Sequence, residues 1–289
     1  MEQHSRGNML VICSAVCFGL MPIFARFAYQ NHVEVQELLL VRFVLAFLVM
    51  GLFLLLTRRR FVPPRKQLLV LLALGGVGYF LQASLYFTSL LYVPVSIVSL
   101  ILYTYPAFVV AGSLMLRWEK PSVSLGLCLF LALVGLALVA NPVGHIVSIG
   151  LLMALGASVT YAVYILVSSR VLKDVSGELA SFYVMGAAAL SFLASDSLTG
   201  RMHISWDFQA WVWVILISII STCLAITAFF QGVKLIGPSR ASILSAIDPV
   251  TSVIAASILF SEFLNVYQCL GGLLVILAAT VATFSKKTR

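Results

Sequence analysis

Long apolar runs, separated by short polar breaks, constrain this chain more than any other feature of its sequence. A membrane-crossing helix needs about 20 predominantly apolar residues, and runs near that length cover 8–28, 37–57, 68–90, 94–116, 122–141, 148–169, 178–195, 209–232, 240–261 and 265–285. Charged residues make up 10% of the chain and hydrophobic residues 62%, whereas a soluble domain carries about 25% charged residues. Because so little polar surface remains to cover a core in water, lipid must surround most of the chain. The sequence therefore predicts an all-α integral membrane protein with ten transmembrane helices in a lipid bilayer.

Basic residues predict the direction in which these helices cross the membrane. The first run has no convincing small-residue cleavage site, which favours a retained helix over a signal peptide. If the chain starts in the cytoplasm, fifteen of the eighteen lysines and arginines fall on the cytoplasmic side, two fall outside, and Arg42 lies within a run. This bias follows the positive-inside rule, so we expect a multi-pass protein of the inner cell membrane with both termini in the cytoplasm. The net charge of +8 is spread over short loops, which argues against a nucleic-acid partner.

The two halves of the chain resemble each other. The same residue types recur at a spacing of 143 positions in four pairs, which are Pro106 and Pro249, Glu119 and Glu262, Ser96 and Ser239, and Ser99 and Ser242. Each half holds five predicted helices, and since five is odd, the second half must enter the membrane from the opposite side. We therefore predict two inverted five-helix repeats, over 1–142 and 143–289, around a central cavity. Inverted repeats are typical of transporters, in which two similar halves open a midplane site to each side in turn.

A segment of the ninth run carries a family resemblance. Residues 238–250 read PSRASILSAIDPV and lead to Glu262, and this stretch resembles the best-known part of the EamA family within the drug/metabolite transporter superfamily. Gly271 and Gly272 in the tenth run fit the same pattern. The resemblance covers essentially the whole chain. It implies a basket-like bundle whose central cavity is lined by helices one, three, four, six, eight and nine. It leaves the solute open, since the family carries amino acids, nucleosides, vitamins and other metabolites.

Asp248 lies near the middle of the ninth run, directly before Pro249. A charge at the bilayer centre costs about 2.5–3.5 kcal/mol on insertion scales, so this side chain should face the protein interior or water. We consider two roles for Asp248. It either contacts the solute, as the partner of a cation or as a proton-coupling carboxylate, or it forms a buried structural hydrogen bond. The matching position in the first half is Tyr105, so the cavity should be chemically asymmetric.

Three further charged residues are candidates for a role in transport. Arg42 resembles an arginine often found in the second helix of the family. It is either a counter-charge for a solute carboxylate or for Asp248, or a side chain that snorkels to the outer headgroups. Glu119 and Glu262 end the fourth and ninth runs, and we expect them to form helix-end hydrogen bonds at a gate or turn.

Tyrosines are dense in the third, fourth and sixth runs. Their spacing places Tyr79, Gln82 and Tyr86 on one helix face, and Tyr161 and Tyr164 on another. A polar-aromatic face can stack on a solute or hydrogen-bond to it, although ordinary packing would explain the same residues. The candidate solute contacts of this kind are Tyr79, Gln82, Tyr86, Tyr103, Tyr105, Tyr161 and Tyr164.

Three prolines within the runs predict helix kinks. Pro22, Pro106 and Pro249 interrupt the first, fourth and ninth runs. In a rocking mechanism such kinks act as hinges, but kinks are also common static features of membrane helices.

These features are best explained by a transporter of small organic metabolites such as amino acids. We expect it to work by alternating access, in the direction of efflux. One intramembrane acid is compatible with proton coupling and with uncoupled transport. The alternatives are a membrane-embedded enzyme, a channel and a passive scaffold protein. The sequence has no HExxH, GxSxG or phosphate-loop motif, and its five cysteines lack metal-binding spacing. We therefore expect no catalytic residues, no bound metal and no cofactor.

Overall fold

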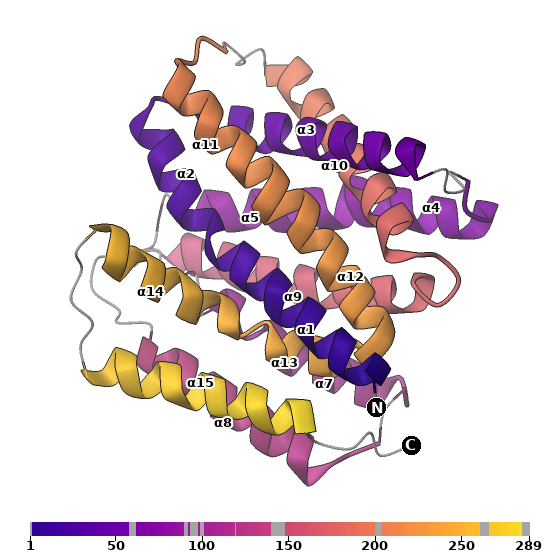
Figure 1. Ribbon diagram of the computed structural model, residues 1–289, viewed down its shortest axis with the longest axis vertical. Helices are drawn as coiled ribbons and strands as arrows, with labels where there is room; N and C mark the ends of the chain where they lie inside the picture. Colours follow the sequence, from indigo (N-terminus) through magenta and orange to yellow (C-terminus); the bar gives the residue numbers. More distant parts are fainter. Residues whose placement is uncertain are drawn as a thin grey trace.

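The computed structural model describes residues 2–57, 62–89, 92, 98, 101–118, 120–139, 148–199, 204–260 and 266–284. This part of the chain is helical and contains no strand (Figure 1). Its first half forms α1 (Glu2–Gly19), α2 (Met21–Gln30), α3 (Val35–Leu56), α4 (Arg65–Ala73), the π-helical turn η1 (Leu74–Tyr79), α5 (Phe80–Ser89), α7 (Tyr105–Met115) and α8 (Val123–Val139). Its second half forms α9 (Ser148–Val171), α10 (Gly177–Thr199), α11 (Phe208–Ser218), the π-helical turn η2 (Ile219–Leu224), α12 (Ala225–Ile236), α13 (Pro238–Leu244), α14 (Ile247–Phe260) and α15 (Val266–Phe284).

Six of the predicted spans are confirmed as helices long and apolar enough to cross a membrane. They cover Gln3–Gln30, Val35–Leu56, Arg65–Ser89, Ser148–Val171, Gly177–Leu198 and Phe208–Ile236. Shorter apolar helices lie at Tyr105–Met115, Val123–Leu138 and Cys269–Ala278, within the predicted fourth, fifth and tenth runs. In lipid the backbone satisfies its own polar groups only by forming helices or closed barrels, which explains why these runs are helical. The full count of ten remains a prediction.

Helix ends follow the local sequence. Glu34 and Glu37 form a reciprocal capping box at the start of α3, which satisfies backbone N–H groups that have no partner within the helix. Asp207 caps α11 by accepting a hydrogen bond from the Ala210 N–H at 2.8 Å. Gly237 ends α12 with a positive φ of 86°, a conformation that costs glycine little.

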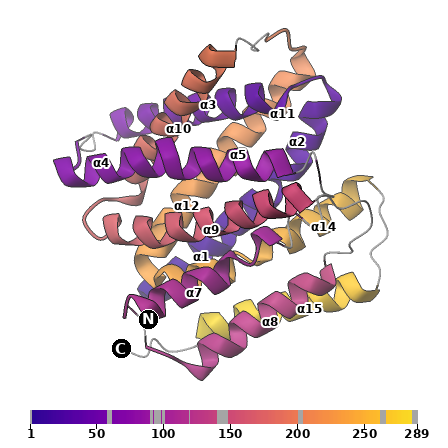
Figure 2. The ribbon, with the colours of Figure 1, turned by 180° about the vertical axis from the view of Figure 1, so that it is seen from behind.

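Helices from the two halves pack against one another in matched pairs. Contacts join α8 to α15 and α3 to α10, and they also join α1 to α12 and α5 to α9. The α8–α15 pair lies at one edge of the bundle in both views (Figures 1 and 2). At this contact a side chain on Gly135 would meet the Gly271 carbonyl at 2.7 Å, so glycine permits the close approach of the two helices.

Several helices are interrupted near a predicted kink. Leu20 separates α1 from α2, a turn at 103–104 precedes α7, and a turn at 245–246 separates α13 from α14. Pro22, Pro106 and Pro249 each lie one to two residues after the start of the helix that follows the interruption. These interruptions agree with the kinks predicted at the three prolines, whose action as hinges remains a proposal.

Polar contacts join the basic helix ends on one side of the bundle. The Gln67 amide of α4 donates to the Asp174 carboxylate between α9 and α10, at 3.0 Å. Lys234 of α12 donates to the Val175 carbonyl, also at 3.0 Å. The guanidinium of Arg170, in the last turn of α9, lies 3.7 Å from the Trp118 ring centroid, just beyond α7. We call this region, around Arg65, Lys66, Arg170, Lys173 and Lys234, the basic face.

Tryptophans gather where α2, α3 and α11 pack together. The Trp206 indole donates to the Glu37 carboxylate at 2.9 Å, and its ring lies 5.0 Å from that of Trp211. Trp213 stacks on Phe27 at 4.4 Å. Tryptophans are enriched at membrane–water interfaces, which agrees with an interfacial position for this end of α11.

Candidate functional site

Asp248 lies in the first turn of α14, directly after the interruption at 245–246. Pro249 has no N–H to donate to the Ser245 carbonyl, and this carbonyl instead accepts from the Asp248 N–H at 3.0 Å. The Asp248 carboxylate accepts a hydrogen bond from the Tyr103 hydroxyl. The side chain is only half-buried. The structure thus places a partly exposed aspartate at a helix interruption inside the bundle.

The interruption in α1–α2 lies against the same point. Gly19, the last residue of α1, packs so closely on α14 that an added side chain would meet the Asp248 carbonyl oxygen at 2.6 Å. The Gly19 carbonyl accepts a hydrogen bond from the Ser252 hydroxyl at 2.7 Å. The two interrupted helices are therefore held together beside Asp248.

Five tyrosines form a continuous aromatic cluster from the third, fourth and sixth runs. Ring-centroid distances are 5.8 Å between Tyr103 and Tyr105, 4.7 Å between Tyr105 and Tyr161, 6.0 Å between Tyr161 and Tyr164, and 5.5 Å between Tyr164 and Tyr79. We call this set the tyrosine cluster. Asp248 interacts electrostatically with Tyr79, Tyr103, Tyr105 and Tyr161. The structure thus brings together Asp248 and these predicted residues, from both halves of the chain.

Tyr105 and Tyr161 occupy the middle of the cluster but differ in accessibility. Tyr105 is 1% exposed, and its hydroxyl donates to the Ser242 carbonyl of α13 at 3.5 Å. Tyr161 is only half-buried. Tyr161 and Asp248 are therefore only partly buried, whereas the other four tyrosines of the cluster are buried.

Arg42 lies at the other end of the tyrosine cluster and is 1% exposed. Its guanidinium donates to the Tyr79 hydroxyl and to the Met21 sulfur at 3.1 Å. It also lies over the Phe43 ring at 4.6 Å and the Phe87 ring at 5.8 Å. This burial disagrees with snorkelling to the headgroups. Among the residues described, the contacts of Arg42 are with neutral groups, so Arg42 is not an ion-pair partner of Asp248 in this conformation.

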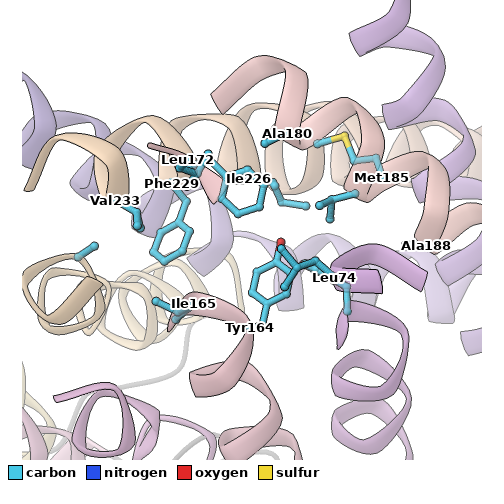
Figure 3. Close-up of a cluster of buried hydrophobic side chains, with 14 of the residues drawn as sticks. Leu74, Tyr164, Ile165, Leu172, Ala180, Met185, Ala188, Ile226, Phe229 and Val233 are labelled. Carbon is cyan, nitrogen blue, oxygen red and sulfur yellow. The ribbon is translucent and has the colours of Figure 1, made fainter. Parts of the chain in front are cut away.

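The Tyr164 hydroxyl is surrounded by apolar side chains. The oxygen lies in an apolar cluster with Leu74, Met185 and Ile226 (Figure 3). It finds no hydrogen-bond partner within the described part of the chain. The Tyr164 ring belongs to the tyrosine cluster, and a contact of Tyr164 with a solute stays a prediction.

The remaining predicted residues have separate outcomes. Gln82 is buried, and Tyr86 is half-buried beside Phe87, at a ring distance of 5.3 Å. Glu119 and Glu262, the predicted gate residues, lie outside the described residues. No group of three or more histidines, cysteines or carboxylates suited to a metal occurs in the residues that the structure describes.

Ser158 is a polar contact of the site that sequence patterns did not single out. Because Pro106 has no N–H, the Leu102 carbonyl lacks its usual helical partner, and it accepts from the Ser158 hydroxyl of α9 at 2.9 Å. The Ser158 hydroxyl also lies 3.0 Å from that of Thr104. A serine 56 residues away in sequence carries no local signal for this role, but a free carbonyl before a proline predicts that some donor is needed.

The fold and the site define a polytopic helical membrane protein with a polar-aromatic site between its two halves. Comparison with known proteins identifies the family. The EamA-like transporter family matches the chain twice, over residues 5–141 and 148–284. The chain belongs to the EamA-like transporter family, which confirms the resemblance seen in the ninth run.

Relatives of similar length carry transporter names. An uncharacterized transporter of Archaeoglobus fulgidus is 26% identical over 276 residues, which cover 96% of each chain. The uncharacterized transporter YcbK of Bacillus subtilis is 25% identical over 93% of this chain and 90% of its own. The uncharacterized inner membrane transporter YicL of Salmonella typhimurium is 22% identical over 100% and 99% of the two chains.

One solved structure has the same fold. Titled "Crystal structure of protein", it superposes with a TM-score of 0.83 and covers 96% of this chain and 98% of its own, at 20% sequence identity. Together, the family and the apolar helices make this a multi-pass membrane protein of a transporter family.

Proposed function

We propose that the protein exports small organic metabolites, such as amino acids, by alternating access at a central cavity around Asp248. The observation that carries this proposal is the half-buried Asp248 carboxylate at a helix interruption, surrounded by tyrosines from both halves of the chain. A site shared between two halves changes its access when one half rocks against the other. In this mechanism the kinks at Pro22, Pro106 and Pro249 serve as hinges.

The two halves, 1–142 and 143–289, would be inverted repeats with five spans each. Three observations support this part of the proposal. The family matches each half separately. A π-helical turn occurs in the third run and again in the eighth, and interruptions precede both Pro106 and Pro249. The pairing of α1 with α12 has its counterpart in the pairing of α9 with α5 when the halves are exchanged.

Both termini would lie in the cytoplasm, with the basic face toward it. The contacts of Gln67, Lys234 and Arg170 gather basic helix ends on one side, as the positive-inside rule requires of a cytoplasmic side. The start of α1 and the end of α15 also lie on one side of the bundle (Figure 1). The name of one relative, an inner membrane transporter, agrees with the expected membrane.

Transport by the purified protein in liposomes tests the function. A thermal-shift screen against amino acids, nucleosides and vitamins first identifies a solute, and its movement is then followed with wild type and with Asp248→Asn. We expect wild type to move the solute, and Asp248→Asn to reduce both the rate and its dependence on pH. Asp207→Asn is the matched control, because asparagine caps a helix about as well as aspartate and Asp207 caps α11 away from the site.

The outcomes separate the parts of the proposal. If the wild-type protein in liposomes moved none of the solutes that the thermal-shift screen identified, transport itself would be contradicted. If Asp248→Asn moved the identified solute as wild type does, at every pH, the role of Asp248 would be contradicted.

A further inference from the structure

The two charged side chains in the middle of the bundle differ sharply in accessibility. Asp248 is half-buried, whereas Arg42 is 1% exposed. The Arg42 guanidinium contacts the Tyr79 hydroxyl and the Met21 sulfur and lies over aromatic rings, while its buried Nε finds no hydrogen-bond partner among the described residues. A solute that reaches Asp248 therefore meets a carboxylate, while the nearest buried cation is closed off by neutral groups.

Arg170 and Lys234 lie in the last turns of α9 and α12, on the basic face. Among the described residues, the group that acts on the Asp248 carboxylate is the Tyr103 hydroxyl and not a basic side chain. In the part of the chain that the structure describes, no accessible cation lies beside Asp248 to receive a carboxylate from a solute.

The groups around Asp248 suit a positive charge. The Tyr103 hydroxyl donates to the carboxylate, which leaves further oxygen lone pairs to accept from a solute. The faces of tyrosine rings attract cations, with about 0.5–2 kcal/mol for each favourable contact. Tyr161 is the one tyrosine of the cluster that is only partly buried, and it interacts electrostatically with Asp248.

We infer that the site recognises a protonated amino group on the solute, held between the Asp248 carboxylate and the tyrosine rings, and does not recognise a carboxylate. This inference rests on the proposed function and narrows it. An amino acid would bind through its ammonium group alone, and an amine of the same shape without a carboxylate would bind at least as tightly.

Three probes with a common phenyl body test the inference on the wild-type protein. They are 2-phenylethylamine, phenylalanine and 3-phenylpropanoate, which are a cation, a zwitterion and an anion at neutral pH. Binding to the purified full-length chain in detergent is measured by calorimetry, and uptake of each probe is measured in liposomes. We expect the amine to bind at least as tightly as phenylalanine, and the acid to bind at least about ten-fold more weakly, which corresponds to the loss of one hydrogen bond to a charged group.

The Asp248→Asn variant then assigns the effect to a residue, with Asp207→Asn as the control. Asp248→Asn should weaken binding of 2-phenylethylamine about ten-fold or more, while the control variant should bind this amine as tightly as wild type does. Equal or tighter binding of 3-phenylpropanoate, tighter binding of phenylalanine than of the amine, or binding of none of the three would overturn the inference. Uptake of the acid without uptake of the amine would overturn it and still support transport, so failure here is distinct from failure of the proposed function.

Discussion

The Tyr164 hydroxyl gives a prediction in which one small change should stabilise the protein. Tyr164 is 3% exposed, and its hydroxyl finds no hydrogen-bond partner among the described residues. A buried polar group without a partner costs about 1–3 kcal/mol. Tyr164→Phe removes this oxygen and keeps the ring that packs on Tyr161 and Phe230. We therefore expect the free energy of unfolding to rise by about 1–3 kcal/mol.

Tyr105→Phe is the matched change, with the opposite expected effect on stability. The Tyr105 hydroxyl donates to the Ser242 carbonyl, so removal of this hydroxyl should lower the free energy of unfolding by about 0.5–1.5 kcal/mol. Thermal unfolding of both variants in the same detergent, followed by circular dichroism, measures the two effects. With about 2–4 °C for each kcal/mol, Tyr164→Phe should raise Tm by at least about 2 °C, and Tyr105→Phe should lower it. A Tm for Tyr164→Phe at or below that of wild type would refute the reasoning from the unpaired hydroxyl.

Two further predictions concern helix contacts. Gly135→Ala should destabilise the protein, because the new methyl group would meet backbone atoms of α15 at 2.7–2.9 Å. On the same helix, the methyl group of Gly126→Ala would meet nothing within 4 Å, so this variant should stabilise the protein by up to about 1 kcal/mol. Equal Tm values for the two variants would contradict this packing. Ser158→Ala should cost about 1–3 kcal/mol, because it leaves the Leu102 carbonyl without the donor at 2.9 Å, and an unchanged Tm would show that this carbonyl needs no donor.

Sequence patterns predicted the six long apolar helices well, and several of the candidate site residues lie together in the structure. The apolar runs gave the six long helices, since in lipid a run of this length has few alternatives to a helix. The cost of a charge in the membrane predicted that Asp248 would face the protein interior or water. Helical spacing placed Tyr161 and Tyr164 on one face, and their rings do lie 6.0 Å apart.

Sequence patterns of this kind did not predict the contacts between helices. Periodicity gives the face of a helix but not the neighbour that the face meets, so it did not reveal that the Tyr164 hydroxyl enters an apolar cluster. The burial of Arg42 depends on Met21, Phe43 and Phe87, which come together from three helices. The Ser158 contact joins positions 56 residues apart. Each of these features is a property of tertiary packing and leaves no local mark on the sequence.

The central claim is that Asp248 lies at a site that opens to each side of the membrane in turn. In a background without the five native cysteines, Asp248→Cys is treated with a membrane-impermeant thiol reagent from the outside of oriented vesicles, and separately from the inside. Ala154→Cys, at a fully buried position of α9, is the control and should stay unmodified from both sides. Alternating access predicts that the cysteine at position 248 is modified from either side. Modification from one side only, or from neither, would contradict the account.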